Sequence, residues 1–175
     1  MHYVLIMQEG GTCMVCDVSA IMNMEGASAS FSGTLDRFSL VSDIEVTSTQ
    51  IDATFTCTGG VLDLAASVSA ELLTSCARCL KEITFPLTFD FSETLVLAGQ
   101  ETTADADSVI FFEGKEIDVG EIAINNLLLN ISTKYLCKDD CRGLCPKCGK
   151  DLNEGDCGCD FVEIDPRWEK LKNFK

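Results

Sequence analysis

Alternating apolar and polar positions dominate the first half of the chain. Apolar side chains occupy every second position from Ile51 to Cys57 and again from Leu62 to Leu72, with Thr58-Gly59-Gly60 between the two runs. A period of two places the apolar side chains of a strand on one face, and glycine accepts the backbone of a tight turn. The pattern therefore predicts a long β-hairpin with one buried face.

A third strand is predicted over 83–91, where apolar residues again alternate with polar ones. Because Pro86 cannot donate a backbone hydrogen bond, we expect this strand to have a free edge at that point. Weaker alternation predicts two more strands near 29–35 and 43–48. Together these segments should form an antiparallel sheet that curls into a barrel or folds into a sandwich.

A helix is predicted after an irregular stretch over 99–116, which we expect to be a loop. Asp118 and Glu121 have the spacing of a capping box, in which each side chain satisfies a backbone N–H of the first helical turn. The helix should end near Ile131 and pack an apolar stripe on the sheet. The residues of that stripe are Val119, Ile122, Ala123, Leu127 and Ile131.

Charge divides the chain into two parts. The 175 residues carry 28 acids and 13 bases, and residues 1–133 hold 19 of the acids but only four of the bases. Such a body repels nucleic acid unless bases gather elsewhere. Residues 134–150 carry five bases and two acids, so any RNA contact is expected there. The candidate RNA contacts are Lys138, Arg142, Lys147 and Lys150.

The cysteines are the candidate metal ligands of the chain. Eleven cysteines, with no secretory signal predicted at the N-terminus, favour cytoplasmic thiolates that hold metal over a disulfide framework. No apolar run approaches the ~18 residues that span a bilayer. Cys-x2-Cys turns offer two thiolates to one ion, a common half of a tetrahedral zinc site. Four cysteine pairs predict two sites of four thiolates: Cys76 with Cys79, Cys137 with Cys141, Cys145 with Cys148, and Cys157 with Cys159.

Two groupings of these pairs are open. In the first, the four cysteines of 145–159 close a local zinc ribbon, and Cys76 and Cys79 join Cys137 and Cys141. In the second, Cys76 and Cys79 join Cys145 and Cys148, and the outer pairs join each other. We favour the first because a local loop closes at a lower cost in entropy.

The remaining candidates have simpler interpretations. Cys57 falls on the apolar side of its strand and is expected in the core. Cys13 and Cys16 have ligand spacing but stand alone, and His2 is expected to be an exposed terminal residue. The chain contains no Ser/His/Asp set, P-loop or GxGxxG motif, so we predict a protein that is not an enzyme.

Several motifs resemble those of the YceD family, the large ribosomal RNA subunit accumulation proteins of bacteria and plastids. The resemblance covers about residues 14–175, and its most specific part is 137–153. It is carried by Cys-Ala-Arg-Cys-Leu at 76–80, by Cys-Lys-Asp-Asp-Cys-Arg-Gly-Leu-Cys-Pro-Lys-Cys-Gly-Lys-Asp-Leu-Asn at 137–153, and by Asp-Pro-Arg-Trp at 165–168. The resemblance implies a metal-binding protein with a role in 23S rRNA accumulation. We expect its partners to be large-subunit rRNA or basic ribosomal proteins, since the acidic body attracts basic proteins, and we expect no membrane and no small-molecule substrate.

The predicted fold class is α+β and strand-dominated, and the chain divides into four parts. They are a non-native or disordered extension over 1–13, an antiparallel β-domain over 14–98, a loop and packed helix over 99–136, and a Cys-rich, zinc-ribbon-like module over 137–175. The last part should end in a short helix after Pro166, with apolar contacts at Trp168 and Leu171.

The predicted function is that of a non-enzymatic, cytoplasmic factor for large ribosomal subunit assembly, with about two structural zinc ions. Two other classes of protein stay open. One is a thiol redox protein that uses a single CxxC pair. The other is a protein-interaction module of an unrelated pathway.

Overall fold

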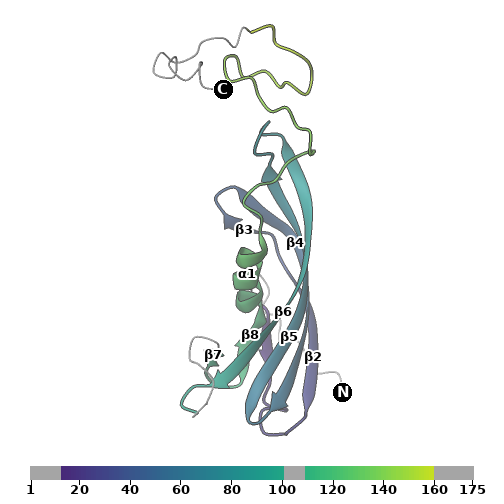
Figure 1. Ribbon diagram of the computed structural model, residues 1–175. Helices are drawn as coiled ribbons and strands as arrows, with labels where there is room; N and C mark the ends of the chain where they lie inside the picture. Colours follow the sequence, from purple (N-terminus) through teal and green to yellow (C-terminus); the bar gives the residue numbers. More distant parts are fainter. Residues whose placement is uncertain (1–12, 101–108, 160–175) are drawn as a thin grey trace, which may run out of the picture.

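The computed structural model describes residues 13–100 and 109–159 of the chain (Figure 1). Within these ranges it contains a six-stranded sheet, a two-stranded sheet and one α-helix. The elements are β1 (Val15–Asp17), β2 (Ser28–Leu35), β3 (Phe38–Val41), β4 (Ile44–Thr58), β5 (Val61–Ser75), β6 (Glu82–Leu97), β7 (Val109–Phe112), β8 (Glu116–Asp118) and α1 (Val119–Asn130). His2 and the expected terminal helix with Trp168 and Leu171 lie outside the described residues.

The predicted long hairpin is confirmed as β4 and β5, each 15 residues long. The turn between them places Gly59 and Gly60 at φ +60° and +85°, a backbone that glycine adopts without strain. β4 also includes the strand predicted near 43–48, which is separated from the rest only by a bulge between Val46 and Ser48. The hairpin therefore extends further than its alternating pattern indicated.

β6 pairs antiparallel with β5 and places Pro86 opposite Glu71. On its other side, β6 pairs with a described strand only over 94–97. The free edge predicted at Pro86 is therefore present among the described strands.

The loop predicted over 99–116 is partly wrong. Val109–Phe112 forms β7, which runs parallel to the end of β6, and Glu116–Asp118 forms β8, which pairs with β1. Both strands are short, and β8 pairs with a segment about a hundred residues earlier in the chain. An alternating pattern depends only on residues that are close together in the chain, so it could not predict this long-range pairing.

Of the two predicted forms of the sheet, the barrel is wrong, because the main sheet is open. Its strand order is β2-β4-β5-β6-β7, with β3 also paired to β4. One face carries the core and is covered by α1, by the two-stranded sheet of β1 and β8, and by Val18 and Ile21 between β1 and β2. These elements bury the apolar face of β2, β4 and β5, so the sheet does not need to close on itself.

α1 begins and ends as predicted. Asp118 caps it by accepting a hydrogen bond from the Glu121 N–H at 3.2 Å, and Leu127 is 1% exposed against the sheet. No helix in the described part of the chain is long and apolar enough to cross a membrane. Beyond α1 the chain runs past the end of the β5–β6 hairpin, where the cysteine-rich segment lies (Figure 1).

Candidate metal centres

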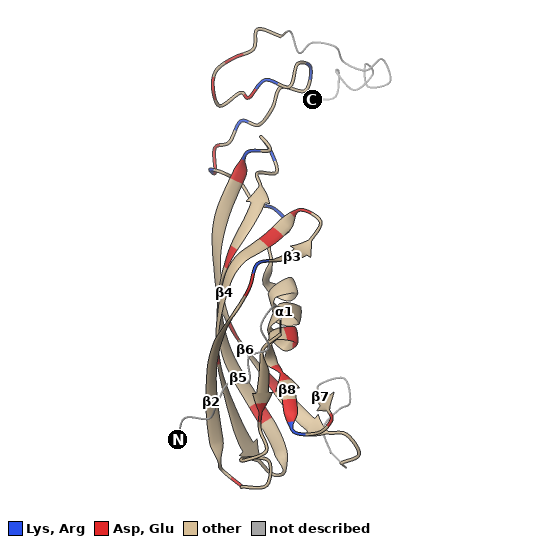
Figure 2. Ribbon diagram, turned by 180° about the vertical axis from the view of Figure 1, so that it is seen from behind, with Lys and Arg blue, Asp and Glu red and all other residues tan. Residues whose placement is uncertain are grey.

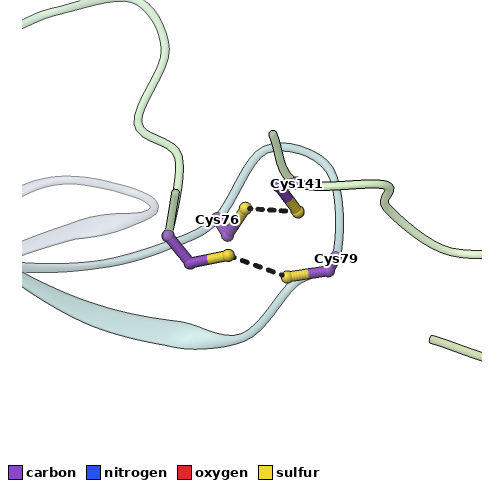
Figure 3. Close-up of side chains that lie close together, drawn as sticks. Cys76, Cys79 and Cys141 are labelled. Carbon is purple, nitrogen blue, oxygen red and sulfur yellow. Dashed lines mark hydrogen bonds between the residues drawn. The ribbon is translucent and has the colours of Figure 1, made fainter. Parts of the chain in front are cut away.

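Cys76 and Cys79 lie in the turn that joins β5 to β6. The Cys76 N–H donates to the Lys81 carbonyl at 2.8 Å, and the Leu80 N–H donates to the Cys76 carbonyl at 2.9 Å. Leu80 takes φ +59°, a conformation in which glycine is more usual. These two bonds fold the turn so that both sulfurs point toward the chain that follows α1 (Figure 3).

Four cysteines meet at this turn and form what we call site 1: Cys76, Cys79, Cys137 and Cys141. The Sγ atoms of Cys76 and Cys141 are 3.8 Å apart, those of Cys79 and Cys137 are 3.6 Å apart, and all four lie within 4.8 Å of one another (Figure 3). A tetrahedral ion with Zn–S bonds of about 2.3 Å places its sulfurs about 3.8 Å apart. The thiols of site 1 therefore fit a zinc ion.

The other four cysteines form site 2: Cys145, Cys148, Cys157 and Cys159. Their sulfurs also lie within 4.8 Å of one another. The Cys145 N–H donates to the Lys150 carbonyl at 2.8 Å, and the Gly149 N–H donates to the Cys145 carbonyl at 2.8 Å. This turn repeats the backbone bonds of the Cys76–Cys79 turn, and site 2 also fits a tetrahedral ion.

The grouping in the structure is the one favoured on entropic grounds, with a local group over 145–159 and a second group that joins the hairpin to the segment after α1. The remaining cysteines belong to neither group. Cys57 is 2% exposed and lies in the core, as predicted. Cys16 is also buried in the core, while the exposed Cys13 donates from Sγ to the Asp118 carboxylate at 2.9 Å.

Arg78 holds the two segments of site 1 together. Its Nη1 donates to the carbonyls of Cys141 and Asp139 at 2.7 and 3.2 Å, and its own carbonyl accepts from the Leu144 N–H at 3.1 Å. Gly143 lies against this contact at φ +75°, and a Cβ there would lie 3.0 Å from the Arg78 carbonyl oxygen. Sequence reasoning did not single out Arg78 or Gly143, because their roles depend on contacts between distant segments.

In each Cys-x2-Cys turn, backbone N–H groups lower the pKa of the first cysteine. The N–H groups of Cys137 and Cys79 lower the pKa of the Cys76 thiol from 9.0 to about 6. The N–H groups of Cys148 and Lys147 do the same for Cys145, whose pKa is also about 6. Each turn therefore stabilises a thiolate at neutral pH, the form that a metal ion binds.

Other sulfurs resist ionisation without an ion. Burial raises the pKa of the Cys137 thiol to about 12. A hydrogen bond with the Cys148 thiol raises the pKa of Cys159 to about 12. A divalent ion would supply the positive charge that four thiolates in one place require.

The candidate RNA contacts lie around these sites and are all exposed. Arg142 pairs with Asp156 at 2.6 Å and Lys138 with Asp140 at 3.7 Å, while Lys147 has no ion-pair partner within 13–100 and 109–159. Lys81, which directly precedes β6, also lies beside site 1. Figure 2 shows that the basic residues are concentrated at this end of the molecule. Lys81 and Lys138 both line a cleft of about 490 Å³ beside site 1, together with Cys79, Cys137, Asp151, Asn153 and Glu154.

The family model for "Large ribosomal RNA subunit accumulation protein YceD" matches residues 64–175, which include every cysteine of sites 1 and 2. The chain belongs to the YceD family. The match confirms the resemblance to this family that the motifs at 76–80 and 137–153 indicated.

Individual relatives support the same assignment. An uncharacterized protein of Mycobacterium tuberculosis is 32% identical over 114 residues, which are 64% of this chain and 54% of that protein. An uncharacterized protein of Mycobacterium leprae is 26% identical over 113 residues, 63% of this chain and 52% of that protein. The chain thus spans about half the length of the curated mycobacterial relatives it matches.

A plant relative carries a functional name. "Large ribosomal RNA subunit accumulation protein YCED homolog 1, chloroplastic" of Arabidopsis thaliana is 35% identical over 63 residues, which are 36% of this chain and 20% of that protein. No solved structure matches the chain.

Proposed function

We propose that this YceD-family chain is a non-enzymatic, cytoplasmic factor that holds two structural zinc ions and supports large ribosomal subunit assembly and 23S rRNA accumulation. The observation that carries the proposal is the convergence of eight cysteines into two four-thiol groups at one end of the sheet. The family name supplies the link to large-subunit rRNA.

The geometry supports structural metal more than catalysis. Four thiolates complete the tetrahedral coordination of zinc and leave no position for a substrate or a reactive water. A thiol redox protein needs one accessible, low-pKa cysteine beside a partner thiol. Here Cys76 and Cys141, which have lowered pKa values in site 1, are both buried, and four sulfurs rather than two meet there.

Charge separates two kinds of ribosomal partner. The body over 1–133 carries a net charge of -15, from 19 acids and four bases. Four thiolates around a divalent ion add a formal charge of about -2 at each site, so the ions do not make this end attractive to RNA. With about three phosphate contacts, binding to naked RNA should be weak, whereas a basic ribosomal protein is drawn to the acidic body.

Binding to rRNA and to ribosomal particles tests the proposal. We expect the isolated chain to bind naked 23S rRNA more weakly than about 1 μM at physiological salt, and to bind large-subunit precursor particles more tightly. Co-sedimentation measures the binding to precursor particles. Cross-linking would identify a ribosomal protein that is the direct partner.

Charge variants distinguish binding to RNA from binding to a basic ribosomal protein. Reversing Lys138, Arg142 and Lys147 together should weaken the RNA component. Reversal of Lys115, an exposed base between β7 and β8, is the matched control and should have little effect, because these strands lie at the other end of the sheet from the cysteine-rich segment (Figure 1). Neutralising Asp52, Asp63 and Asp90 should weaken the protein component. Nanomolar binding to bare rRNA that the three reversals alone abolish would contradict the protein-partner proposal and make this end an RNA-binding module.

A further inference from the structure

Asn153 belongs to the segment that forms site 2, but its side chain contacts site 1. It lies between Cys148 and Cys157 in the chain, and its Nδ2 is 3.4 Å from the Sγ of Cys141. Asn153 is half-buried in the cleft beside site 1. One side chain therefore connects the segment closed by site 2 to a ligand of site 1.

Hydrogen bonds fix the orientation of the Asn153 amide. Its Oδ1 accepts from the Arg142 backbone N–H at 2.9 Å, and its Nδ2 also donates to Oδ1 of Asp151 at 2.7 Å. The Arg142 N–H can only donate, so the amide oxygen must face it and the amide NH2 group must face the sulfur. Both donors and the acceptor of the amide are thus in use.

The backbone around Asn153 is tied to the same contact. Leu144 and Asp151 form an antiparallel bridge, and the Leu152 N–H donates to the Gly143 carbonyl at 2.9 Å. Leu144 in turn donates to the Arg78 carbonyl of the β5–β6 turn. The loop that carries Asn153 is therefore held at one side by site 1 and closed at the other by the cysteines of site 2.

We propose that Asn153 is a positioning residue that couples the two metal sites. When an ion closes site 2, the loop holds the Asn153 amide against Cys141, and the amide donor stabilises the negative charge of that sulfur as a metal ligand. Occupation of site 2 thus tightens metal binding at site 1. By linkage, an ion in site 1 tightens binding at site 2 by the same factor.

Arg78 and Gly143 make a separate connection, through the Arg78 guanidinium and the backbone of the turn. The proposal assigns the metal-dependent part of the coupling to the Asn153 side chain, and it rests on the proposed metal binding.

Metal titration of the full chain tests the coupling. The probe is cadmium, a thiolate-binding ion whose NMR spectrum should give one resonance for each site. Competition with a chelator then gives the affinity of each site. Cys148→Ser empties site 2 and assigns the two resonances.

Loss of the Asn153 amide should weaken site 1 by about 10- to 100-fold, the range for partners that hydrogen-bond a metal ligand. We expect this loss in Asn153→Ala, and at least as large a loss in Asn153→Asp, which places a carboxylate beside the sulfur. The cadmium resonance of site 1 should shift in both variants, whereas Asn125→Ala, at an exposed position of α1, should change neither affinity nor resonance.

A double-mutant cycle gives the decisive comparison. Emptying site 2 with Cys148→Ser should weaken site 1 by about tenfold or more when Asn153 is present, and by less than about twofold in the Asn153→Ala background. Hydrogen exchange of the β4–β5 hairpin checks that every variant keeps its sheet.

Two outcomes would overturn the coupling. They are site 1 affinity unchanged by Asn153→Ala, and an effect of Cys148→Ser on site 1 that is the same in both backgrounds. A wild-type chain that binds no metal would instead contradict the proposed metal-holding function.

Discussion

Sites 1 and 2 are built on the same turn but connect different parts of the molecule. In both, the first cysteine donates its N–H to the lysine carbonyl five residues later, and its carbonyl accepts from the residue after the second cysteine. That last residue is Gly149 in site 2, at φ +73°, and Leu80 in site 1, at φ +59°. The Cys-x2-Cys sequence therefore determines the turn in two very different surroundings.

The surroundings give the two sites different roles. In site 1, Cys76 and Cys141 are 65 residues apart in the chain and at most 3% exposed, and they join the β5–β6 hairpin to the segment after α1. In site 2, all four ligands lie within 145–159, and Cys148 is exposed. Closing a long loop removes more entropy from the unfolded chain than closing a short one. Site 1 should thus contribute to the stability of the whole fold, and site 2 mainly to its own loop.

The largest effect is expected from Cys79→Ser. This variant should lose the ion of site 1 and release the β5–β6 turn from the segment after α1. We expect a loss of about 3 kcal/mol or more in the free energy of unfolding, or roughly 10 °C in melting temperature. Zinc content and thermal unfolding followed by circular dichroism measure both effects.

Cys148→Ser is the matched control for that experiment. It should remove the ion of site 2 and lower the melting temperature by less than half as much, because the ligands of site 2 lie within one short loop. Equal destabilisation by the two variants would show that the sites do not differ in the way described.

An intermediate effect is expected from two glycines with the same backbone conformation. Alanine at Gly143 or at Gly149 meets a positive φ, which costs roughly 1–2 kcal/mol. At Gly143 the added Cβ also lies 3.0 Å from the Arg78 carbonyl, whereas at Gly149 nothing lies within 4 Å. Gly143→Ala should therefore destabilise the protein by about 1 kcal/mol more than Gly149→Ala, as measured by chemical denaturation. A smaller loss for Gly143→Ala would contradict the close contact between the hairpin turn and 141–144.

The smallest effect is expected in the number of protons that are released when zinc binds. The pKa values of Cys76 and Cys145 are lowered from 9.0 to about 6, so both thiols are already ionised at pH 7.5. Zinc binding at that pH should release fewer than four protons from each site, and the number should rise as the pH falls through 6. Calorimetry in buffers of different ionisation enthalpy measures the release. Four protons from each site at pH 7.5 would show that the turns do not stabilise a thiolate.

The same shifts fix a pH dependence for the metal-free chain. A lowered pKa in the folded state adds stability that is complete above about pH 9, declines as the pH falls, and is gone below about pH 6. The raised pKa values of Cys137 and Cys159, about 12, act in the opposite direction: their contribution is complete below about pH 9 and is lost as the pH rises through 12.

Local signals were the part of the structure that the sequence could predict. Alternation predicted the β4–β5 hairpin and Pro86 marked a free edge, while Asp118 and Glu121 located the start of α1. The cost of loop closure favoured the grouping of the cysteines that the structure contains. In each case the residues that determine the feature are close together in the chain.

Contacts between distant segments could not be predicted in this way. No repeating pattern of apolar residues indicates that β1 pairs with β8 or that β7 pairs in parallel with β6. An open sheet and a barrel share the same alternation, and the difference lies in whether other elements cover the apolar face. Arg78 and Asn153 have polar side chains of a common kind, and only the fold shows that they contact Cys141.

The zinc content of the freshly purified, reduced full chain tests the central claim most directly. Elemental analysis should find about two zinc ions per chain, and about one in both Cys79→Ser and Cys148→Ser. Less than one zinc ion per wild-type chain would contradict the account of two four-thiolate metal sites.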